Sequence, residues 1–330
     1  MMTVPEETEF CFPQLLNSSC RKIMRPHSVS MLIYTTLSSI SVVTVTLNLL
    51  IIISISHFKK LHTPTNLLLL SLAVSDFFVG LLMVFQIILI DGCWFLGDLM
   101  CAVYFIFDHI FTSASIGTMV LISVDRYVAI CYPLLYPTKV TQNRAKICVL
   151  MCWLICVLFH CLLLKDNIKH PGRYNSCLGE CVVIKDYYAG IADVLCSFIG
   201  PVTVIVILYV RIFVVALSQA RALRTHIKDA KLQGSVRITV KKSELKAART
   251  LGVVVVVFLI CVCPYFCVTL KGDDAVVSAS SAAFVMCLFY VNSCLNPLIY
   301  VFFYPWFRNC IRVIVTLQIL KPGSCDANIL

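Results

Sequence analysis

Residues 65–90 read TNLLLLSLAVSDFFVGLLMVFQIILI, and this stretch decides the fold. Asp76 is its only charged residue. A helix of ~20 residues crosses a hydrocarbon layer of ~30 Å, so this run is long enough to span a membrane. A carboxylate inside such a helix is costly unless it faces a polar partner. Asp76 therefore predicts a bundle of helices rather than a lone anchor.

The same pattern occurs seven times along the chain. The other apolar runs lie at 30–56, 99–131, 146–165, 187–216, 250–270 and 276–303. Each contains a polar, large or helix-kinking residue of the kind that faces a bundle interior. These residues are Asn48, Asp108, Trp153, Pro201, Pro264 and Pro297. We predict an all-α membrane protein with an extracellular segment at 1–29 and a seven-transmembrane bundle at 30–303. An amphipathic membrane-surface helix and a short cytoplasmic tail occupy 304–330.

Composition supports a membrane protein and argues against nucleic acid as a partner. Of the 330 residues, 60% are hydrophobic and 13% are charged, whereas an ordinary soluble domain is about 25% charged. The formal charge is +10. Its Lys and Arg residues separate hydrophobic runs and do not form a basic patch on a polar domain.

Lys and Arg also set the orientation. The connection 211–249 contains ten of them, and the short connections 57–64 and 132–145 are basic too. Basic loops stay in the cytoplasm, while the acidic connection 91–98 lies opposite. We expect a plasma-membrane protein with an extracellular N-terminus, which would make Asn17 in Asn-Ser-Ser a glycosylation site.

Two acids are predicted in the outer half of the bundle. Asp108 lies five helical turns before Arg126, about 27 Å along the helix. No Lys or Arg is near it on that run, so a ligand ammonium would fill the role of counter-ion. The alternative is a structural acid that is hydrogen-bonded to Ser, Thr or Tyr. Asp193 lies ~12 Å further out than Pro201 on the fifth run.

Two carboxylates that face one cavity suggest a ligand with two ammonium groups. This gives the hypothesis that the preferred agonist is a diamine. The alternative is that Asp193 faces the second outer loop or water. Aromatic side chains that could line the site are Trp94, Tyr265, Phe266 and Phe289, for which ordinary packing is the other interpretation.

Two motifs carry a family resemblance. Asp125-Arg126-Tyr127 closes the third run, and NPLIY at 296–300 closes the seventh. With the interior residues above in this order, the chain resembles the rhodopsin-like receptors over nearly its whole length.

A narrower resemblance lies in residues 292–307, NSCLNPLIYVFFYPWF. This stretch is similar to the fingerprint of trace amine-associated receptors. The resemblance implies a fish-type olfactory receptor for small protonated amines that activates a stimulatory heterotrimeric G protein. It also implies that Asp108 binds the amine and that Tyr290 is its hydrogen-bond partner.

The resemblance assigns further residues by position. It implies an allosteric sodium ion, and no other cofactor, held by Asp76, Ser115, Asn292, Ser293 and Asn296; a water-filled polar network is the alternative. Activation and G-protein coupling are assigned to Asp125, Arg126, Tyr127, Tyr209, Glu244 and Tyr300. Of the six cysteines expected on the extracellular side, it implies the pair Cys101–Cys181 and suggests Cys20–Cys177, with Cys11 and Cys93 unassigned.

One departure from the family pattern stands out. The family usually has Trp where this chain has Val262. That position lies beneath the ligand and couples it to the sodium region. A smaller side chain predicts a deeper pocket floor or weaker coupling.

Other function classes fit less well. His109 and His160 are isolated in apolar runs, and no metal-ligand or nucleophile–base pattern occurs, so we do not expect an enzyme. A serotonin-like aminergic receptor is the near alternative. An amine transporter would usually have more spans and discontinuous helices.

Overall fold

The computed structural model describes residues 9–15, 17–229, 252–253, 255–268, 279–303 and 305–327. The described part is helical, with isolated β-bridges and no β-strand. The long helices are α1 (His27–His57), α2 (Pro64–Ile90), α3 (Asp98–Cys131), α5 (Gln142–Leu163), α8 (Gly200–Asp229) and α10 (Ala279–Phe303). The short helices are α4 (Tyr136–Lys139), α6 (Lys165–Lys169), α7 (Tyr187–Val194) and α11 (Pro305–Val315).

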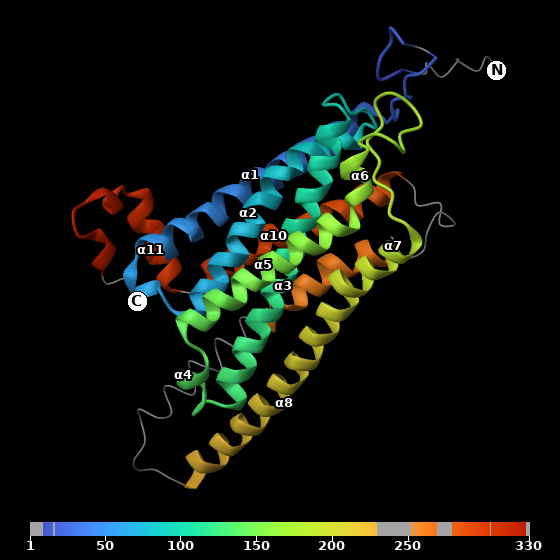
Figure 1. Cartoon of the computed structure of the whole chain (residues 1–330). Coiled ribbons are helices and arrows are strands. Elements are labelled where there is room, and N and C mark those ends of the chain that lie inside the picture. The colour runs from blue at the N-terminus through green and yellow to red at the C-terminus, as the bar shows by residue number, and fades with distance from the viewer. Residues whose placement is uncertain are drawn as a thin grey trace, which may run out of the picture.

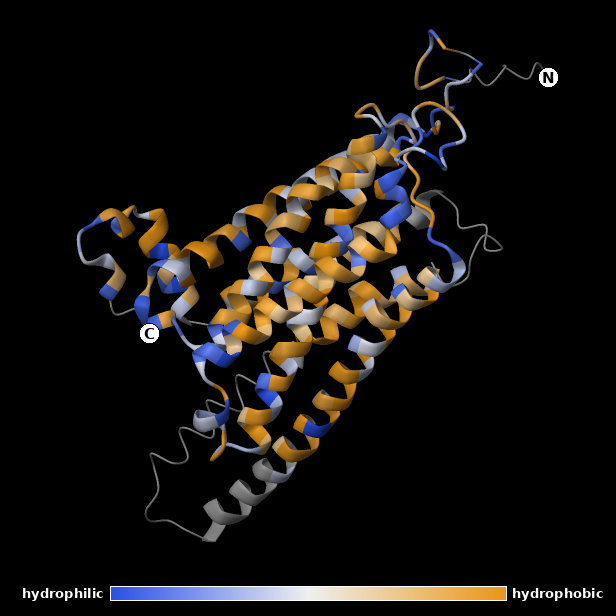
Figure 2. Ribbon diagram, in the orientation of Figure 1, coloured by the Kyte–Doolittle hydropathy of each residue, from blue (hydrophilic) through white to orange (hydrophobic). Residues whose placement is uncertain are grey.

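The long helices run side by side as one bundle (Figure 1). Five described helices are long and apolar enough to cross a membrane, namely α1, α2, α3, α5 and the continuous helix Tyr187–Ala216. Two shorter apolar helices, Val255–Val268 and Phe284–Ile299, supply the remaining predicted spans. Hydrophobic residues dominate the middle of the bundle and polar residues collect at its ends (Figure 2). The predicted all-α membrane architecture is confirmed.

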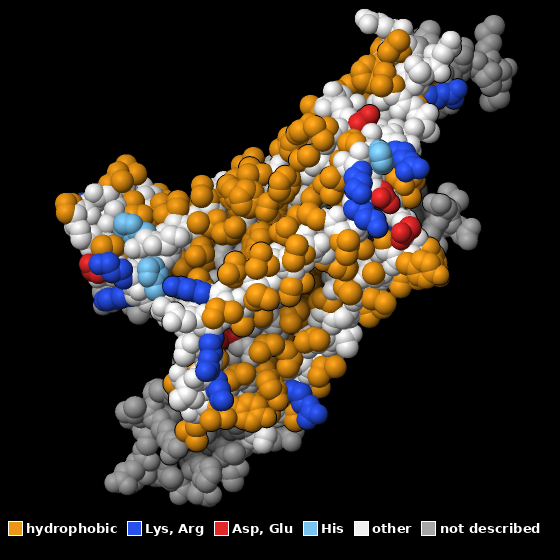
Figure 3. All heavy atoms as spheres, in the orientation of Figure 1, with side chains coloured by type: hydrophobic (Ala, Val, Ile, Leu, Met, Phe, Trp, Pro, Cys, Tyr) orange, Lys and Arg blue, Asp and Glu red, His pale blue; other side chains and the backbone are white. Residues whose placement is uncertain are grey.

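The lateral surface of the bundle is apolar (Figure 3). Leu158 on α5 is 69% exposed and Phe213 on α8 is 64% exposed. Side chains of this kind are stable where lipid replaces water.

Small and polar residues hold the helices together. α3 packs against α2, α5 and α8, and α10 packs against α1 and α2. A Cβ at Gly80 would lie 3.0 Å from side-chain atoms of Thr44 and Val45, so a glycine permits the close approach of α1 and α2. Ser41 donates to the Gly80 carbonyl at 2.7 Å.

Trp153 has a polar partner in the bundle. Its indole Nε1 donates to Ser71 Oγ at 3.0 Å, and Ser71 pairs with Thr118 at 3.1 Å. These bonds join α5, α2 and α3, which explains a large indole in an otherwise apolar span.

The fifth span contains a π-helical turn at Leu195–Ile199, between α7 and α8. Pro201 lacks an N–H, and its ring crowds the carbonyl of the preceding turn, so the regular ladder cannot pass through it. The Gly200 N–H donates to Leu195 O, which closes the wider turn. This turn lies directly after the helical segment that carries Asp193.

Three disulfides tie the N-terminal segment and the loops to one end of the bundle. The pairs are Cys11–Cys93, Cys20–Cys177 and Cys101–Cys181. The latter two are the pairs expected from the resemblance, and the first joins the two cysteines that it left unassigned. We call this end the disulfide end. Asn17 is exposed there.

The opposite end of α1 is covered by α11 and the tail. Phe307 and Cys310 of α11 are fully buried in the same core cluster as Phe58. Lys59 forms an ion pair with Asp326 at 3.2 Å, and its hydrogen bond lowers the pKa of that carboxyl. Both side chains are exposed, so the pair adds little stability.

Candidate functional site

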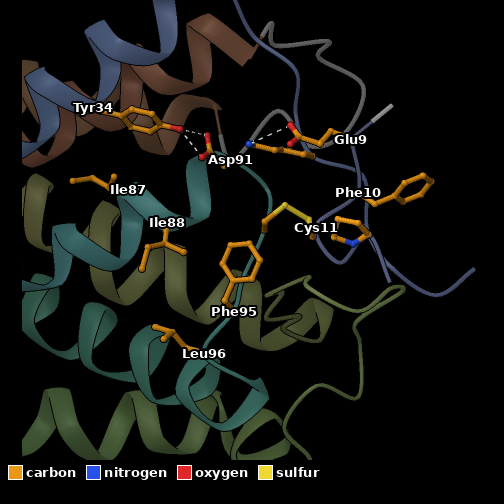
Figure 4. A pocket seen from close by; sticks show the side chains of 12 residues that line it. Glu9, Phe10, Cys11, Tyr34, Ile87, Ile88, Asp91, Phe95 and Leu96 are labelled. Carbon is orange, nitrogen blue, oxygen red and sulfur yellow. Dashed lines mark hydrogen bonds and ion pairs between the residues drawn. A yellow bond between two sulfur atoms is a disulfide. The ribbon is translucent and has the colours of Figure 1, made fainter. Parts of the chain in front are cut away.

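Several cavities lie at the disulfide end, and two of them differ in how their charges are balanced. The larger, about 710 Å³, lies between the N-terminal segment and the ends of α1 and α2 (Figure 4). Its charged groups are matched within the protein: Tyr34 donates to Asp91, and Lys22 pairs with Glu9 at 3.3 Å. The described lining of this cavity therefore offers no unmatched charge to a charged ligand.

The second cavity, about 260 Å³, lies inside the bundle. It is enclosed by residues from α2, α3, α5, the fifth span, the helix Val255–Val268 and α10. The structure brings together all five predicted ligand-binding residues in its lining, namely Asp108, Asp193, Tyr265, Phe266 and Tyr290. This cavity is the candidate ligand site.

Among the described residues, Asp108 has a weak polar partner and no ion-pair partner. The Tyr290 hydroxyl donates to Asp108 Oδ1 at 3.5 Å, at the outer limit of a useful hydrogen bond. Asp108 takes part in none of the ion pairs between described residues. A carboxylate of this kind in a largely apolar cavity attracts a ligand cation.

Asp193 is different because the protein already supplies its counter-ion. Lys185, in the loop between α6 and α7, places its ammonium 2.5 Å from Asp193 Oδ2. Ser197 Oγ donates to the other carboxylate oxygen at 2.9 Å. Asp193 thus lines the cavity, as the diamine hypothesis requires, and also faces the second outer loop, as the alternative holds. Nothing in the sequence singles out Lys185 except its position eight residues before Asp193.

The two histidines of the spans are not isolated, so that prediction is wrong. Their ring centroids are 5.5 Å apart, and both line the cavity. His109 Nδ1 donates to the Phe105 carbonyl at 2.7 Å, which leaves Nε2 to accept from Lys185 at 2.8 Å. His160 Nε2 lies 2.6 Å from Ser113 Oγ. Sequence spacing cannot find this cluster because its members come from α3, α5 and a loop.

Aromatic rings form the wall opposite α3. Phe266 stacks on Phe198 with centroids 4.1 Å apart, and Tyr265 lies 4.6 Å from Phe289. Trp94 is not among the lining residues, so for this side chain the alternative of ordinary packing holds. It is 2% exposed and donates its Nε1 to Gly97 O at 2.8 Å, so it packs beneath the loop.

A second polar site lies deeper, around Asp76, which is fully buried. Ser115 and Ser293 donate to its Oδ1 at 2.9 Å, and Asn296 donates to Oδ2 at 2.9 Å. Asn292 Oδ1 is buried without a hydrogen-bond partner among the described groups. An excess of oxygen acceptors around one carboxylate fits a hard cation such as sodium.

A small cavity of about 20 Å³ joins this site to the ligand cavity. It is lined by Ser115, Asn292 and Ser293 on one side and shares Thr112, Ile116 and Phe289 with the ligand cavity. Val262 forms part of its wall and is 2% exposed. Its volume holds about one water molecule or one ion.

The end of α3 furthest from the disulfides holds a charged network. Asp125 accepts hydrogen bonds from Arg126, from Thr65 at 3.0 Å and from Tyr136 at 2.9 Å. Arg126 also donates to Thr65 at 2.5 Å. The α3 arginine is therefore held against its own helix and α2.

The structure describes only some of the other predicted activation residues. Tyr127 and Tyr209 pack together against Ile130 and Ile212. Glu244 and the side chain of Tyr300 lie outside the described residues.

Comparison with known proteins identifies the family. The model of the 7 transmembrane receptor (rhodopsin family) matches residues 47–300. Trace amine-associated receptor 13c of Danio rerio is 38% identical over 98% of this chain and 97% of its own length. Trace amine-associated receptor 8a of Rattus norvegicus is 38% identical over 96% of this chain and 95% of its own length. This chain belongs to the trace amine-associated receptors.

As a trace amine-associated receptor, the chain is a multi-pass membrane receptor and neither an enzyme nor a transporter. Trace amine-associated receptor 6 of Homo sapiens is 36% identical over 97% of this chain and 95% of its own length. The fish and rat relatives have the same percentage identity to this chain. Sequence identity therefore does not favour a fish-type member. The olfactory role also stays a prediction.

Proposed function

We propose that this receptor detects small protonated amines and that Asp108 binds their ammonium group. The observation that carries the proposal is a cavity carboxylate that forms no ion pair with a described residue, beside Tyr290. Phe266 and Tyr265 present aromatic surface to the same cavity, which favours a cation near the carboxylate. The names of the relatives, trace amine-associated receptors, agree with this ligand class.

The test is an agonist panel of small amines with Asp108→Asn, which keeps the shape of the side chain and removes its charge. We expect a loss of potency of about 100-fold or more, because one partner of a buried charge pair is removed. Asp166→Asn, at an exposed acid on α6, is the matched control. Surface expression is measured in parallel, and unchanged amine potency with normal expression would reject the role of Asp108.

We also propose that the disulfide end is extracellular and that the opposite end engages a stimulatory heterotrimeric G protein. Disulfides persist in oxidising compartments, which supports this orientation at the plasma membrane. The exposed Asn17 at the same end is available for glycosylation. Arg126→Ala should abolish amine-evoked cAMP and leave amine binding intact. Retained signalling would show that Arg126 does not couple the receptor.

An allosteric sodium ion is a further part of the proposal. Asp76, Ser115, Ser293, Asn292 and Asn296 would hold it through oxygen atoms, and it would supply the positive charge that the described neighbours of Asp76 lack. The residues present fit such an ion.

A receptor for diamines is the second candidate function, because Asp193 lines the same cavity as Asp108. A diamine receptor would need a rearrangement at Asp193 that the sequence alone does not indicate. A second ligand ammonium would have to replace Lys185 at Asp193.

A further inference from the structure

We propose that Lys185 acts as an internal counter-ion at Asp193 and thereby restricts this receptor to ligands with a single ammonium group. The inference rests on the proposed role of Asp108 as the ammonium anchor. It assigns Lys185 as a residue that determines ligand specificity.

The first support is the charge balance of the cavity. Its described lining contains two acids, Asp108 and Asp193, and one lysine, Lys185. Lys185 is paired with Asp193 and takes no part in an ion pair with Asp108. One carboxylate therefore remains for one ligand ammonium.

The second support is that both oxygens of Asp193 are engaged. Oδ2 faces the Lys185 ammonium at 2.5 Å, and Oδ1 accepts from Ser197 at 2.9 Å. The side chains of Lys185 and Asp193 are 18% and 15% exposed, so the pair is largely shielded from water. A ligand that approaches Asp193 meets a satisfied carboxylate and a positive charge.

The third support is that the lysine is held in place from three sides. His109 accepts a hydrogen bond from the Lys185 ammonium at 2.8 Å. The backbone is fixed four residues earlier by the Cys101–Cys181 disulfide. It is fixed again directly afterwards, where Asp186 caps α7 by accepting from the Ala189 N–H at 2.6 Å.

At Asp193, Lys185 competes with the second ammonium of a ligand that is already bound at Asp108. A group that is linked to its partner by a short chain competes at an effective concentration on the order of millimolar. Once a diamine is bound at Asp108, its second ammonium is tethered as well and gains no advantage over Lys185. It must also break the contacts of Lys185 with Asp193 and His109. The lysine therefore favours monoamines without reducing access to Asp108.

The test compares monoamines from butylamine to octylamine with the α,ω-diamines of equal length, by cAMP dose–response. In Lys185→Met we expect the potency of diamines to rise about tenfold or more relative to monoamines, because Asp193 loses its internal partner. Lys185→Arg keeps the charge and should keep the wild-type preference for monoamines. Lys169→Met, at an exposed lysine on α6, is the matched control and should change neither class.

The double variant Lys185→Met with Asp193→Asn separates specificity from loop structure. If the gain arises at Asp193, the diamine advantage disappears in the double variant. A purely structural role of the pair predicts instead that Lys185→Met lowers surface expression or affects both amine classes equally, which would overturn the inference.

Failure of the inference is distinguishable from failure of the proposed function. If Asp108→Asn abolishes the response while Lys185→Met leaves the ratio of diamine to monoamine potency unchanged, only the role of Lys185 is rejected. If Asp108→Asn leaves the response intact, the proposed ammonium anchor itself is rejected.

Discussion

The ligand cavity and the Asp76 site differ in the groups that compensate the charge of a buried carboxylate. In the ligand cavity, Asp193 is neutralised by a full charge from a loop, and Asp108 has a weak hydroxyl contact. At the deeper site, Asp76 receives three hydrogen bonds from neutral groups on α3 and α10. The cavities beside these acids measure about 260 Å³ and about 20 Å³.

The difference corresponds to whether the partners of each acid can be replaced by other groups. Groups on a loop and on a ligand can leave, so their charges are replaceable partners for acids near the opening of the bundle. Groups on packed helices cannot leave, so the acid they surround is satisfied by fixed dipoles, and the sodium ion proposed above would balance its charge. The following predictions test this contrast, starting with the largest effect.

Asp76→Ala should cause the greatest loss of stability. It removes the common acceptor of Ser115, Ser293 and Asn296, and each buried donor left unsatisfied costs about 1–3 kcal/mol. We expect a total loss of about 3 kcal/mol, measured by thermal unfolding of purified receptor. Asp193→Ala is the comparison variant, and an equal or larger loss there would contradict the contrast.

Val262→Trp should have the next largest effect. Val262 lines the small cavity between the two sites, and the space of about 20 Å³ is far too small for an indole. Overpacking of this kind costs about 1–3 kcal/mol. Thermal unfolding measures the loss, with Val262→Ile as the conservative control. A stabilised Trp variant with normal signalling would show that the site is built to accept the family's usual residue.

Exchange of sodium for potassium in the medium should change amine potency by up to about tenfold. The ion would hold the deeper site in the arrangement seen here, and a ligand shifts a two-state equilibrium only by its differential affinity. The measurement is agonist dose–response in both salts. Asp76→Asn should remove the dependence on sodium, whereas Asp193→Asn should retain it. Equal salt dependence in all three receptors would indicate general screening.

These contrasts were partly predictable from the sequence. The positions of Asp76, Asp108 and Asp193 follow from helix rise and span order, because each lies in a long apolar run with a fixed direction. The wall residues Tyr265 and Phe266 follow in the same way, from their place beside Pro264.

The partners of these acids were less accessible to prediction. Lys185 comes from a loop whose course is set by a disulfide and a helix cap. His109 reaches it because α3 faces that loop. The π-helical turn at Leu195–Ile199 alters the register of the fifth span after Asp193. For Trp94 the sequence left open whether it lines the site or packs elsewhere, because proximity to α3 does not show that its indole bonds back to its own loop.

The smallest effects come from a matched pair of serine variants. Ser115 donates to Asp76 and Ser197 donates to Asp193, both at 2.9 Å. The bonds have the same chemistry and length, but Asp76 is fully buried while the Asp193 side chain is 15% exposed. Water from the larger ligand cavity can replace the lost donor at Asp193, whereas the space beside Asp76 holds only about one water molecule. We expect Ser115→Ala to cost about 1 kcal/mol and Ser197→Ala less than about 0.5 kcal/mol in thermal unfolding. If the two variants cost the same, burial does not separate the sites, and the contrast between replaceable and fixed partners would have to rest on the charge of Lys185 alone.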